Sequence, residues 1–272
     1  MKRERDEIFQ FNKLSRLHDS EKTIFCKTDY IISEFENIKN KKNKVVLMSG
    51  NSDYAITKDV ANLLPDNVHH WFCTNNLVDH PRITTIPIGL DNSFEALREG
   101  HGVGWDHAIQ KRKILSSIFC KDNEDSITDM IYANFTISTN NNWRASVAGA
   151  CQANDYITYD RHKTEYQEFI DKILSHKMVV CPLGNAPQGQ ADNHRIYETL
   201  YCNRVPIVFF ENQHKLYESI YSKLPVVVLD GPGDLCKKDK IISKYEEVKN
   251  NSVDLVKYSF WENRILQKVN EI

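Results

Sequence analysis

Met178–Phe210 reads MVVCPLGNAPQGQADNHRIYETLYCNRVPIVFF and alternates apolar runs with polar turns. Its first apolar run, Met178–Cys181, is closed by Pro and Gly and is typical of a buried parallel strand. Residues 185–191 carry Pro, Gly and amide side chains without an apolar period, which predicts a loop. The spacing then predicts a helix over Asn193–Cys202 and a second buried strand over Val205–Phe210. This order of elements indicates a parallel α/β sheet.

Polar residues predict the ends of this helix and a possible ligand beside it. Asp192 can cap the first turn, and Asn203 can take the left-handed conformation that ends a helix. Arg195 and Glu198, three residues apart, share one face near the N-terminal end. Main-chain N–H groups, the helix dipole and a guanidinium suit a diphosphate, and a carboxylate one turn on could accept hydrogen bonds from ribose hydroxyls. An ordinary surface ion pair has the same spacing, so both interpretations stay open.

The first half of the chain shows the same alternation of strands and helices. Buried strands are predicted over Thr23–Lys27, Val45–Met48, Val68–Cys73 and Ile83–Ile88, with helices over Ile31–Ile38 and Tyr54–Leu64. In open parallel sheets ligands bind outside the carboxyl ends of the strands. We therefore expect the polar residues after these strands to share one edge of the sheet, and they are Asp29, Asp53, Asn75 and Asp91.

A second unit begins after a glycine-containing connection at residues 94–105. A strand over Ile131–Ser138 is followed by the turn Thr139–Asn142 and by a helix that begins near Trp143. The sequence thus predicts an α/β protein with two Rossmann-like parallel-sheet domains that face a central cleft. The expected segments are residues 1–105 for the first domain, 106–251 for the second, and 252–272 for a C-terminal helix.

Composition excludes several classes of protein. Of the 272 residues, 41% are apolar and 26% are charged, and the formal net charge is −2. Such a balance indicates a globular protein with neither a basic nucleic-acid footprint nor an acidic tail. The apolar runs are strand-sized, far below the about 20 residues of a membrane helix, and no signal peptide is evident. The seven cysteines are scattered without a C-x-x-C pair, so we expect reduced thiols and a cytoplasmic protein.

Metal-binding patterns are weak. The chain contains no Asp-x-Asp pair, and Asp122-Asn123-Glu124 is only a loose analogue within a charged loop. His69 and His70 lie near Cys73, but alternation along a strand sends the two histidines to opposite faces. We expect neither a metal site nor a bound cofactor.

The stretch CPLG…DNHRIYETLYCNRVPIVF resembles the nucleotide-sugar motif of exostosin-type glycosyltransferases, in which an Arg and a Glu flank a helix before a G-x-[IV]-P-[IV] strand. Asn203 stands where that family usually has Gly, and Asn tolerates the same backbone conformation. A second stretch, VVLMSGNSDYAI…WFCTNN…HPRITTIPIGLDN, is similar to the N-terminal half of small viral and bacterial members. The resemblance implies the two-domain GT-B fold, a C-terminal helix that packs back on the first domain, and sugar transfer without an obligate metal.

Glycosyl transfer also needs residues that bind the donor and a base that deprotonates the acceptor. For the diphosphate we favour Arg195 and then Arg144, although Arg144 also fits an ordinary surface position on a helix. Glu198 is our candidate for the ribose, and the remaining donor candidates are Thr139, Asn140, Gly184 and His194.

The base is expected from the first domain. Asp53 is the first choice because Gly50 lets the chain turn there, and its alternative role is a helix N-cap or first-turn acid. The rivals are Asp91, His80 and Asp29.

The sequence therefore predicts a metal-independent, inverting glycosyltransferase that moves a sugar from a nucleotide donor to a glycan acceptor. The donor is expected to be a UDP-sugar, with UDP-xylose as the guess that the exostosin resemblance suggests. One alternative is an α/β protein that binds a nucleotide or a glycan without turnover. Another is a sugar-nucleotide epimerase. No nucleic-acid partner and no membrane span are expected, and the oligomeric state stays open.

Overall fold

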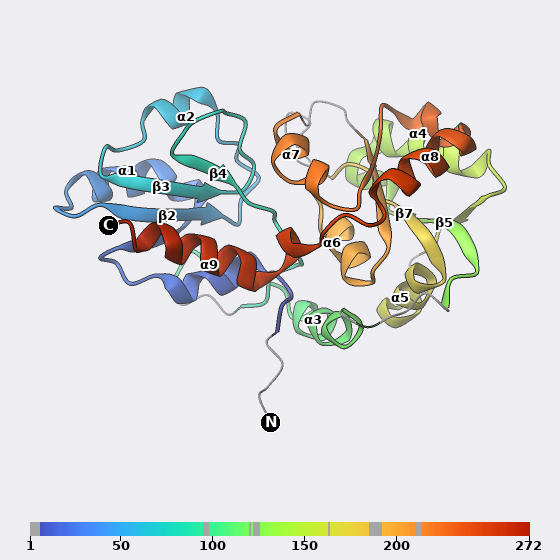
Figure 1. The fold of residues 1–272 in the computed structure, drawn as a ribbon, viewed down its shortest axis with the longest axis horizontal. Helices are drawn as coiled ribbons and strands as arrows, with labels where there is room; N and C mark the ends of the chain where they lie inside the picture. The colour runs from blue at the N-terminus through green and yellow to red at the C-terminus, as the bar shows by residue number, and fades with distance from the viewer. Residues whose placement is uncertain are drawn as a thin grey trace. The chain divides into compact units, whose positions relative to one another are not determined.

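The computed structural model describes residues 6–94, 98–119, 121, 126–162, 164–184, 192–209 and 214–272. The chain divides into two compact units. Unit 1 comprises Met1–Gln110 and Asp254–Ile272, and unit 2 comprises Lys111–Val253. Each contains one parallel sheet with helices, so the predicted α/β class with two Rossmann-like units is confirmed (Figure 1). The division falls after Gln110, within helix α3 (His107–Ile118), rather than after residue 105.

The sheet of unit 1 has four parallel strands in the order β1-β2-β3-β4. They are β1 (Thr23–Lys27), β2 (Val45–Gly50), β3 (Val68–Cys73) and β4 (Ile83–Thr85). All four predicted strands are confirmed, although the last ends at Thr85 and not at Ile88. The strand order follows the chain in one direction, so this sheet has no strand pair at which the order reverses.

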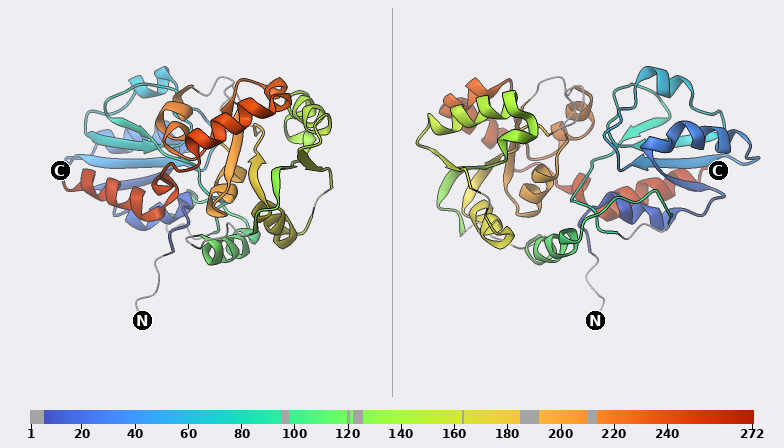
Figure 2. Two further views of the ribbon diagram at one scale, coloured as in Figure 1. Left: turned by 45° about the vertical axis from the view of Figure 1, so that its right-hand side comes forward. Right: turned by 180° about the vertical axis from the view of Figure 1, so that it is seen from behind.

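Helices flank the sheet of unit 1. They are α1 (Ile31–Lys39), α2 (Lys58–Asn62) and α9 (Tyr258–Val269), with short 3-10 turns η1 (Phe11–Leu17), η2 (Thr28–Tyr30) and η8 (Asp254–Val256). α1 buries Ile31, Phe35 and Ile38 against the sheet, as its 3.6-residue period requires. The C-terminal helix α9 packs on β2 and β3 and so belongs to unit 1 (Figures 1 and 2).

The helix predicted over Tyr54–Leu64 is shorter in the structure. Ile56 instead forms a parallel bridge with Asn76, which holds residues before Thr57 in an extended conformation. Thr57 then caps α2 by accepting a hydrogen bond from the Val60 N–H. A tertiary backbone contact thus replaces the first turn that the apolar spacing predicts.

The sheet of unit 2 has five parallel strands in the order β6-β5-β7-β8-β9. They are β5 (Asp129–Asn134), β6 (Ile157–Asp160), β7 (His176–Val180), β8 (Val205–Phe209) and β9 (Val227–Leu229). β6 pairs with one edge of β5 and β7 with the other. The strand order therefore reverses between β5 and β7, which makes this strand pair the topological switch point of the sheet.

The helices of unit 2 connect these strands. They are α4 (Asn141–Gln152), α5 (Tyr166–Leu174), α6 (His194–Tyr201), α7 (His214–Ser219) and α8 (Lys238–Val248), with 3-10 turns η4 (Ile137–Asn140), η6 (Tyr221–Lys223) and η7 (Pro232–Cys236). The strand predicted to reach Ser138 ends at Asn134, because η4 begins at Ile137 and leads directly into α4. None of the described helices is long and apolar enough to cross a membrane.

The turn after β2 differs from our expectation for Gly50. Asn51, and not Gly50, has the left-handed backbone, with φ of 58°. Gly50 is needed for a different reason, because a Cβ there would lie 2.7 Å from the ring of Phe11. The amide of Asn51 donates to Asn12 at 2.7 Å and accepts from Asn92 at 3.0 Å, so side-chain amides join η1 to the segments after β2 and β4.

Gly89 is the glycine of unit 1 whose replacement we expect to cost most. Its φ is +71°, and a Cβ would meet the carbonyl oxygen and ring of Phe9. Gly89→Ala should lower the free energy of unfolding by about 3 kcal/mol, from backbone strain together with the steric clash. Gly100→Ala is the matched control, because Gly100 has φ of +76° but a Cβ there would meet no described atom within 4 Å. Gly100→Ala should lower the free energy of unfolding by only about 1 kcal/mol, as measured by urea denaturation. An equal loss in Gly89→Ala and Gly100→Ala would contradict the role of the clash.

Candidate functional site

The candidate site lies in unit 2, at the carboxyl ends of β5 and β7. This is where open α/β sheets bind ligands, because the loops of adjacent strands diverge at a switch point. Asn134 is the last residue of β5, and β7 leads into Cys181–Gly184. α4 and α6 begin close to these strand ends, so the positive ends of two helix dipoles belong to the same region.

The beginning of α6 corrects one prediction. Asn193, and not Asp192, caps this helix, accepting from the Ile196 N–H through its side chain at 3.3 Å. Asp192 instead accepts hydrogen bonds from the hydroxyls of Tyr197 at 2.6 Å and Tyr221 at 2.9 Å. The two buried phenols engage both oxygens of Asp192, and the side-chain amide of the next residue takes the cap. At the other end, Asn203 has φ of 55°, which confirms the predicted left-handed turn.

Arg195 is held on three sides. Its Nε donates to Glu198 Oε2 at 3.0 Å, and its Nη1 donates to the main-chain oxygen of Asn134 at 2.5 Å. The guanidinium also lies over the ring of Phe169, 4.0 Å from the centroid. Among the described residues no group accepts a hydrogen bond from Nη2, and 28% of the side chain is exposed. Arg195 is therefore a fixed cation with donor capacity left for a ligand.

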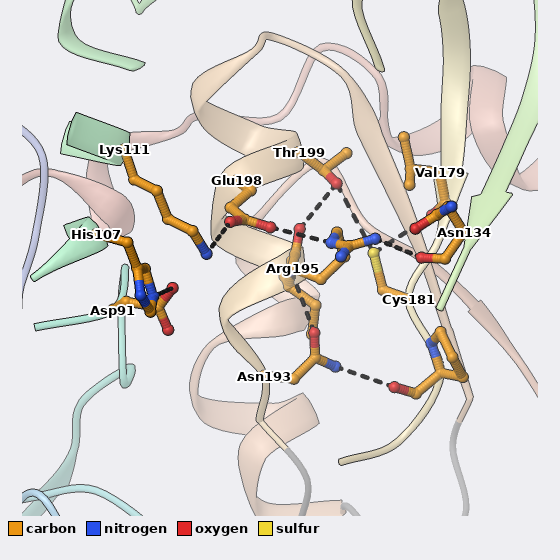
Figure 3. Close-up of polar contacts among 12 residues, drawn as sticks. Asp91, His107, Lys111, Asn134, Val179, Cys181, Asn193, Arg195, Glu198 and Thr199 are labelled. Carbon is orange, nitrogen blue, oxygen red and sulfur yellow. Dashed lines mark hydrogen bonds and ion pairs between the residues drawn. The ribbon is translucent and has the colours of Figure 1, made fainter. Parts of the chain in front are cut away.

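Glu198 is a buried carboxylate shared by two cations. Only 3% of its side chain is exposed. Its Oε1 accepts from Lys111 Nζ at 2.9 Å, while its Oε2 accepts from Arg195 (Figure 3). Lys111 also lies over the ring of Tyr166, 5.0 Å from its centroid. A carboxylate this deep requires such pairing, because an uncompensated buried charge is strongly destabilising.

Arg144, the second candidate for the diphosphate, is occupied by the backbone. Its Nε donates to the main-chain oxygen of Leu183 at 2.8 Å, and Nη1 donates to that of Thr136 at 2.8 Å. Nη2 reaches the oxygen of Pro182 at 3.4 Å. Burial and the neighbouring charge of Arg195 lower the pKa of Arg144 to about 10. Arg144 therefore ties together the chain segments after β5 and β7 and adds positive charge beside Arg195.

The other donor candidates lie around the same strand ends. The Asn140 side chain donates to the main-chain oxygen of Gly184 at 3.3 Å. Thr139 lies in η4, and His194 is the first residue of α6; both side chains are half-buried. Among the described residues, a Cβ on Gly184 would meet nothing within 4 Å. The loop expected at residues 185–191 lies outside the described residues.

The base candidates all belong to unit 1. Asp53 is exposed, and the first-turn role that we weighed for it does not occur because α2 begins later. Asp91 is nearly buried and lies 3.7 Å from the Nε2 of His107, whose side chain is 55% exposed. His80 accepts from the Arg82 N–H at 3.2 Å, and partial burial together with the charge of Arg82 lowers its pKa. Asp29 pairs with Lys27 at 3.3 Å.

The weak metal patterns gain no support. His69 contacts Glu271 at 2.9 Å and His70 contacts Thr84 at 2.8 Å, so the two rings point apart as predicted. Asp122-Asn123-Glu124 lies outside the described residues. Within the ranges that the structure describes, no cluster of three His, Cys, Asp or Glu side chains could hold a metal ion.

Cys181 lies near Arg195, but burial raises the pKa of its thiol to about 12, so it is protonated at neutral pH and is a poor nucleophile.

Sequence reasoning missed five residues of these clusters. Lys111 is 87 positions from Glu198 along the chain, and no local pattern links the two. Asn134 contributes a main-chain oxygen, which any residue would supply. Tyr166 and Phe169 are three apart on α5 and share a face, a pattern equally typical of an ordinary core helix. His107 lacked a signal because its partner, Asp91, lies on another element.

Comparison of the chain with protein-family models and with curated protein sequences finds no match. The exostosin resemblance therefore stays a prediction from the two quoted motifs.

Arg144 should be a determinant of stability. Arg144→Met keeps most of the packing but leaves the main-chain oxygens of Leu183 and Thr136 without this donor, so the free energy of unfolding should fall by about 2–3 kcal/mol. Arg161→Met is the matched control, since Arg161 is exposed in the same unit, and it should change stability by less than about 0.5 kcal/mol. Urea denaturation measures both, and equal stability of the two variants would contradict the anchoring role.

Proposed function

We propose that this protein is a glycosyltransferase whose unit 2 binds the diphosphate of a nucleotide-sugar donor at Arg195. The observation that carries the proposal is a guanidinium fixed at the β5/β7 switch point with Nη2 unused by the described residues. Guanidinium groups bind phosphate oxygens through paired N–H donors, and switch points of α/β sheets are common nucleotide sites. The two parallel-sheet units and the exostosin resemblance support the same function.

The charge of the cluster favours an anionic ligand. Arg195, Arg144 and Lys111 are three cations, and Glu198 is the carboxylate paired with two of them. The cluster therefore carries excess positive charge, and the effect of Arg195 on the pKa of Arg144 places the two guanidiniums within electrostatic reach of each other. A diphosphate would relieve this repulsion. The beginning of α4, without an acidic residue in its first turn, adds a favourable dipole.

The proposed chemistry is inverting transfer from a UDP-sugar, with UDP-xylose as the first donor to try, to a glycan hydroxyl. A base removes the proton of that hydroxyl as its oxygen attacks the anomeric carbon, and the bond to the UDP oxygen breaks. Arg195 stabilises the negative charge that develops on the leaving diphosphate, a task that metal ions perform in other enzymes. The base stays a prediction among Asp53, Asp91 and His80.

Glu198 has a different role in this proposal from the one expected at first. Its two oxygens already accept from Arg195 and Lys111, and its side chain is 3% exposed. A buried acceptor with both oxygens engaged is poorly placed to bind a ribose. We therefore assign Glu198 the orientation of Arg195, and the ribose contact passes to other residues near the strand ends.

Arg195→Ala should weaken the binding of UDP by about 10²-fold or more, because two charge-assisted hydrogen bonds to phosphate are each worth about 1.5–3 kcal/mol. Isothermal titration calorimetry with UDP and with pyrophosphate measures this loss. Arg161→Ala, an exposed arginine of the same unit, is the control and should bind like the wild type. Retained affinity in Arg195→Ala would remove this residue from the site.

Product analysis separates the three functions that the sequence leaves open. A transferase releases UDP and forms a glycoside, an epimerase returns an isomerised UDP-sugar, and a binding protein returns its ligand unchanged. Incubation of UDP-xylose, UDP-glucose and UDP-glucuronic acid with candidate acceptors, followed by chromatography of the nucleotides, therefore tests the proposal. Affinity for UDP without any release of UDP from these donors would favour the binding protein.

A further inference from the structure

Lys111 is a residue of the cluster to which the proposed reaction assigns no task. We propose that Lys111 is a positioning residue, which acts through Glu198 to keep Arg195 available to phosphate. The inference rests on the proposed function, because phosphate is the ligand that Arg195 is argued to bind. It is carried by the row of three charges Lys111, Glu198 and Arg195, in which each oxygen of the carboxylate serves a separate cation (Figure 3).

The geometry explains why the lysine matters. A carboxylate and a guanidinium prefer a bidentate pair, in which both oxygens accept from two N–H groups of the same arginine. Lys111 occupies Oε1 at 2.9 Å, so Glu198 makes a single contact with Arg195, at Nε. Without Lys111, the freed oxygen would compete with phosphate for a second N–H of Arg195. The lysine also offsets the negative charge of a carboxylate that would otherwise neutralise Arg195 alone.

Two aromatic rings of α5 keep Lys111 and Arg195 apart. Tyr166 and Phe169 lie one turn apart on α5, with Lys111 5.0 Å from the first ring centroid and Arg195 4.0 Å from the second. Cations over aromatic faces are held by the ring quadrupole. The spacing of two residues on one helix therefore sets the spacing of the two cations, and Glu198 fits between them.

The first experiment compares three lysine variants by calorimetry with UDP. Lys111→Met removes the charge at similar length and should weaken binding about tenfold. Lys111→Arg keeps a cation that can donate to Oε1 and should stay within about threefold of the wild type. Lys113→Met is the matched control on the same helix, since Lys113 is exposed, and it should bind like the wild type. Unchanged affinity in a folded Lys111→Met protein would overturn the inference.

A double-mutant cycle then tests whether Lys111 acts through Glu198. In a Glu198→Gln background the carboxylate is absent, so Lys111→Met should change the affinity for UDP by less than about twofold. A tenfold loss in that background would show that Lys111 acts directly on the ligand, and would overturn the positioning role. The double variant replaces the charged pair Lys111–Glu198 by two neutral side chains, so it leaves no unpaired charge between them. Its affinity for UDP can therefore be compared with that of Glu198→Gln even if Lys111→Met alone does not fold.

One readout does not depend on the ligand. The Nε–Hε group of Arg195 should give a protected NMR signal, identified by its loss in Arg195→Lys, because it donates to the buried Glu198. Lys111→Met should shift this signal and Lys113→Met should not; an unmoved signal overturns the inference whatever the protein binds. If the signal shifts but the wild type binds neither UDP nor pyrophosphate, the proposed function fails and with it the phosphate role of Lys111, while the structural coupling stands.

Discussion

The buried carboxylate of Glu198 is the constraint on which the rest of the site depends. Removing a carboxylate from water is costly, and breaking a buried ion pair typically destabilises a protein by about 3–5 kcal/mol. Glu198 avoids this cost by pairing with Lys111 from α3 and Arg195 from its own helix. The pairing fixes the two elements relative to each other and, through Arg195, to the end of β5. Because the buried Glu198 needs a cation as a partner, the guanidinium of Arg195 is held at the switch point.

The two arginines of the site divide two tasks. Arg144 satisfies main-chain oxygens from two segments and so shapes the strand ends. Arg195 donates one hydrogen bond to the main chain, and its guanidinium stacks over the ring of Phe169. Its Nη2 donates to no group among the described residues. Buried main-chain oxygens need donors, and an arginine can serve several of them at once because its donors diverge within one plane. Arg144 holds the strand ends in place, and Arg195 beside it keeps a donor unused by the described residues. This arrangement is expected of a preorganised anion site.

Unit 1 is organised by polar contacts of a different kind. The side chain of Asn51 bonds to the side chains of Asn12 and Asn92, and the main-chain N–H of Asn12 donates to the side chain of Asn92. These bonds join η1 to the segments after β2 and β4. Asp91 lies next to this network and faces the exposed imidazole of His107.

The sequence by itself determined the alternation of strands and helices, because buried parallel strands need continuous apolar runs and turns need Gly, Asn or Pro. All four strands of unit 1 and the left-handed turn at Asn203 follow from such local rules. The grouping of Arg195 with Glu198 also follows from the spacing of one helix.

Only the tertiary structure decided how those local patterns are used. Asn193 takes the cap predicted for Asp192, whose carboxylate binds the phenols of Tyr197 and of the more distant Tyr221. The predicted helix after β2 shortens because Ile56 pairs with Asn76. Lys111 joins Glu198 across 87 positions of the chain, which no sequence period can reveal. Local propensities are worth about 1 kcal/mol or less per residue, and a buried charge or a new backbone pairing outweighs them.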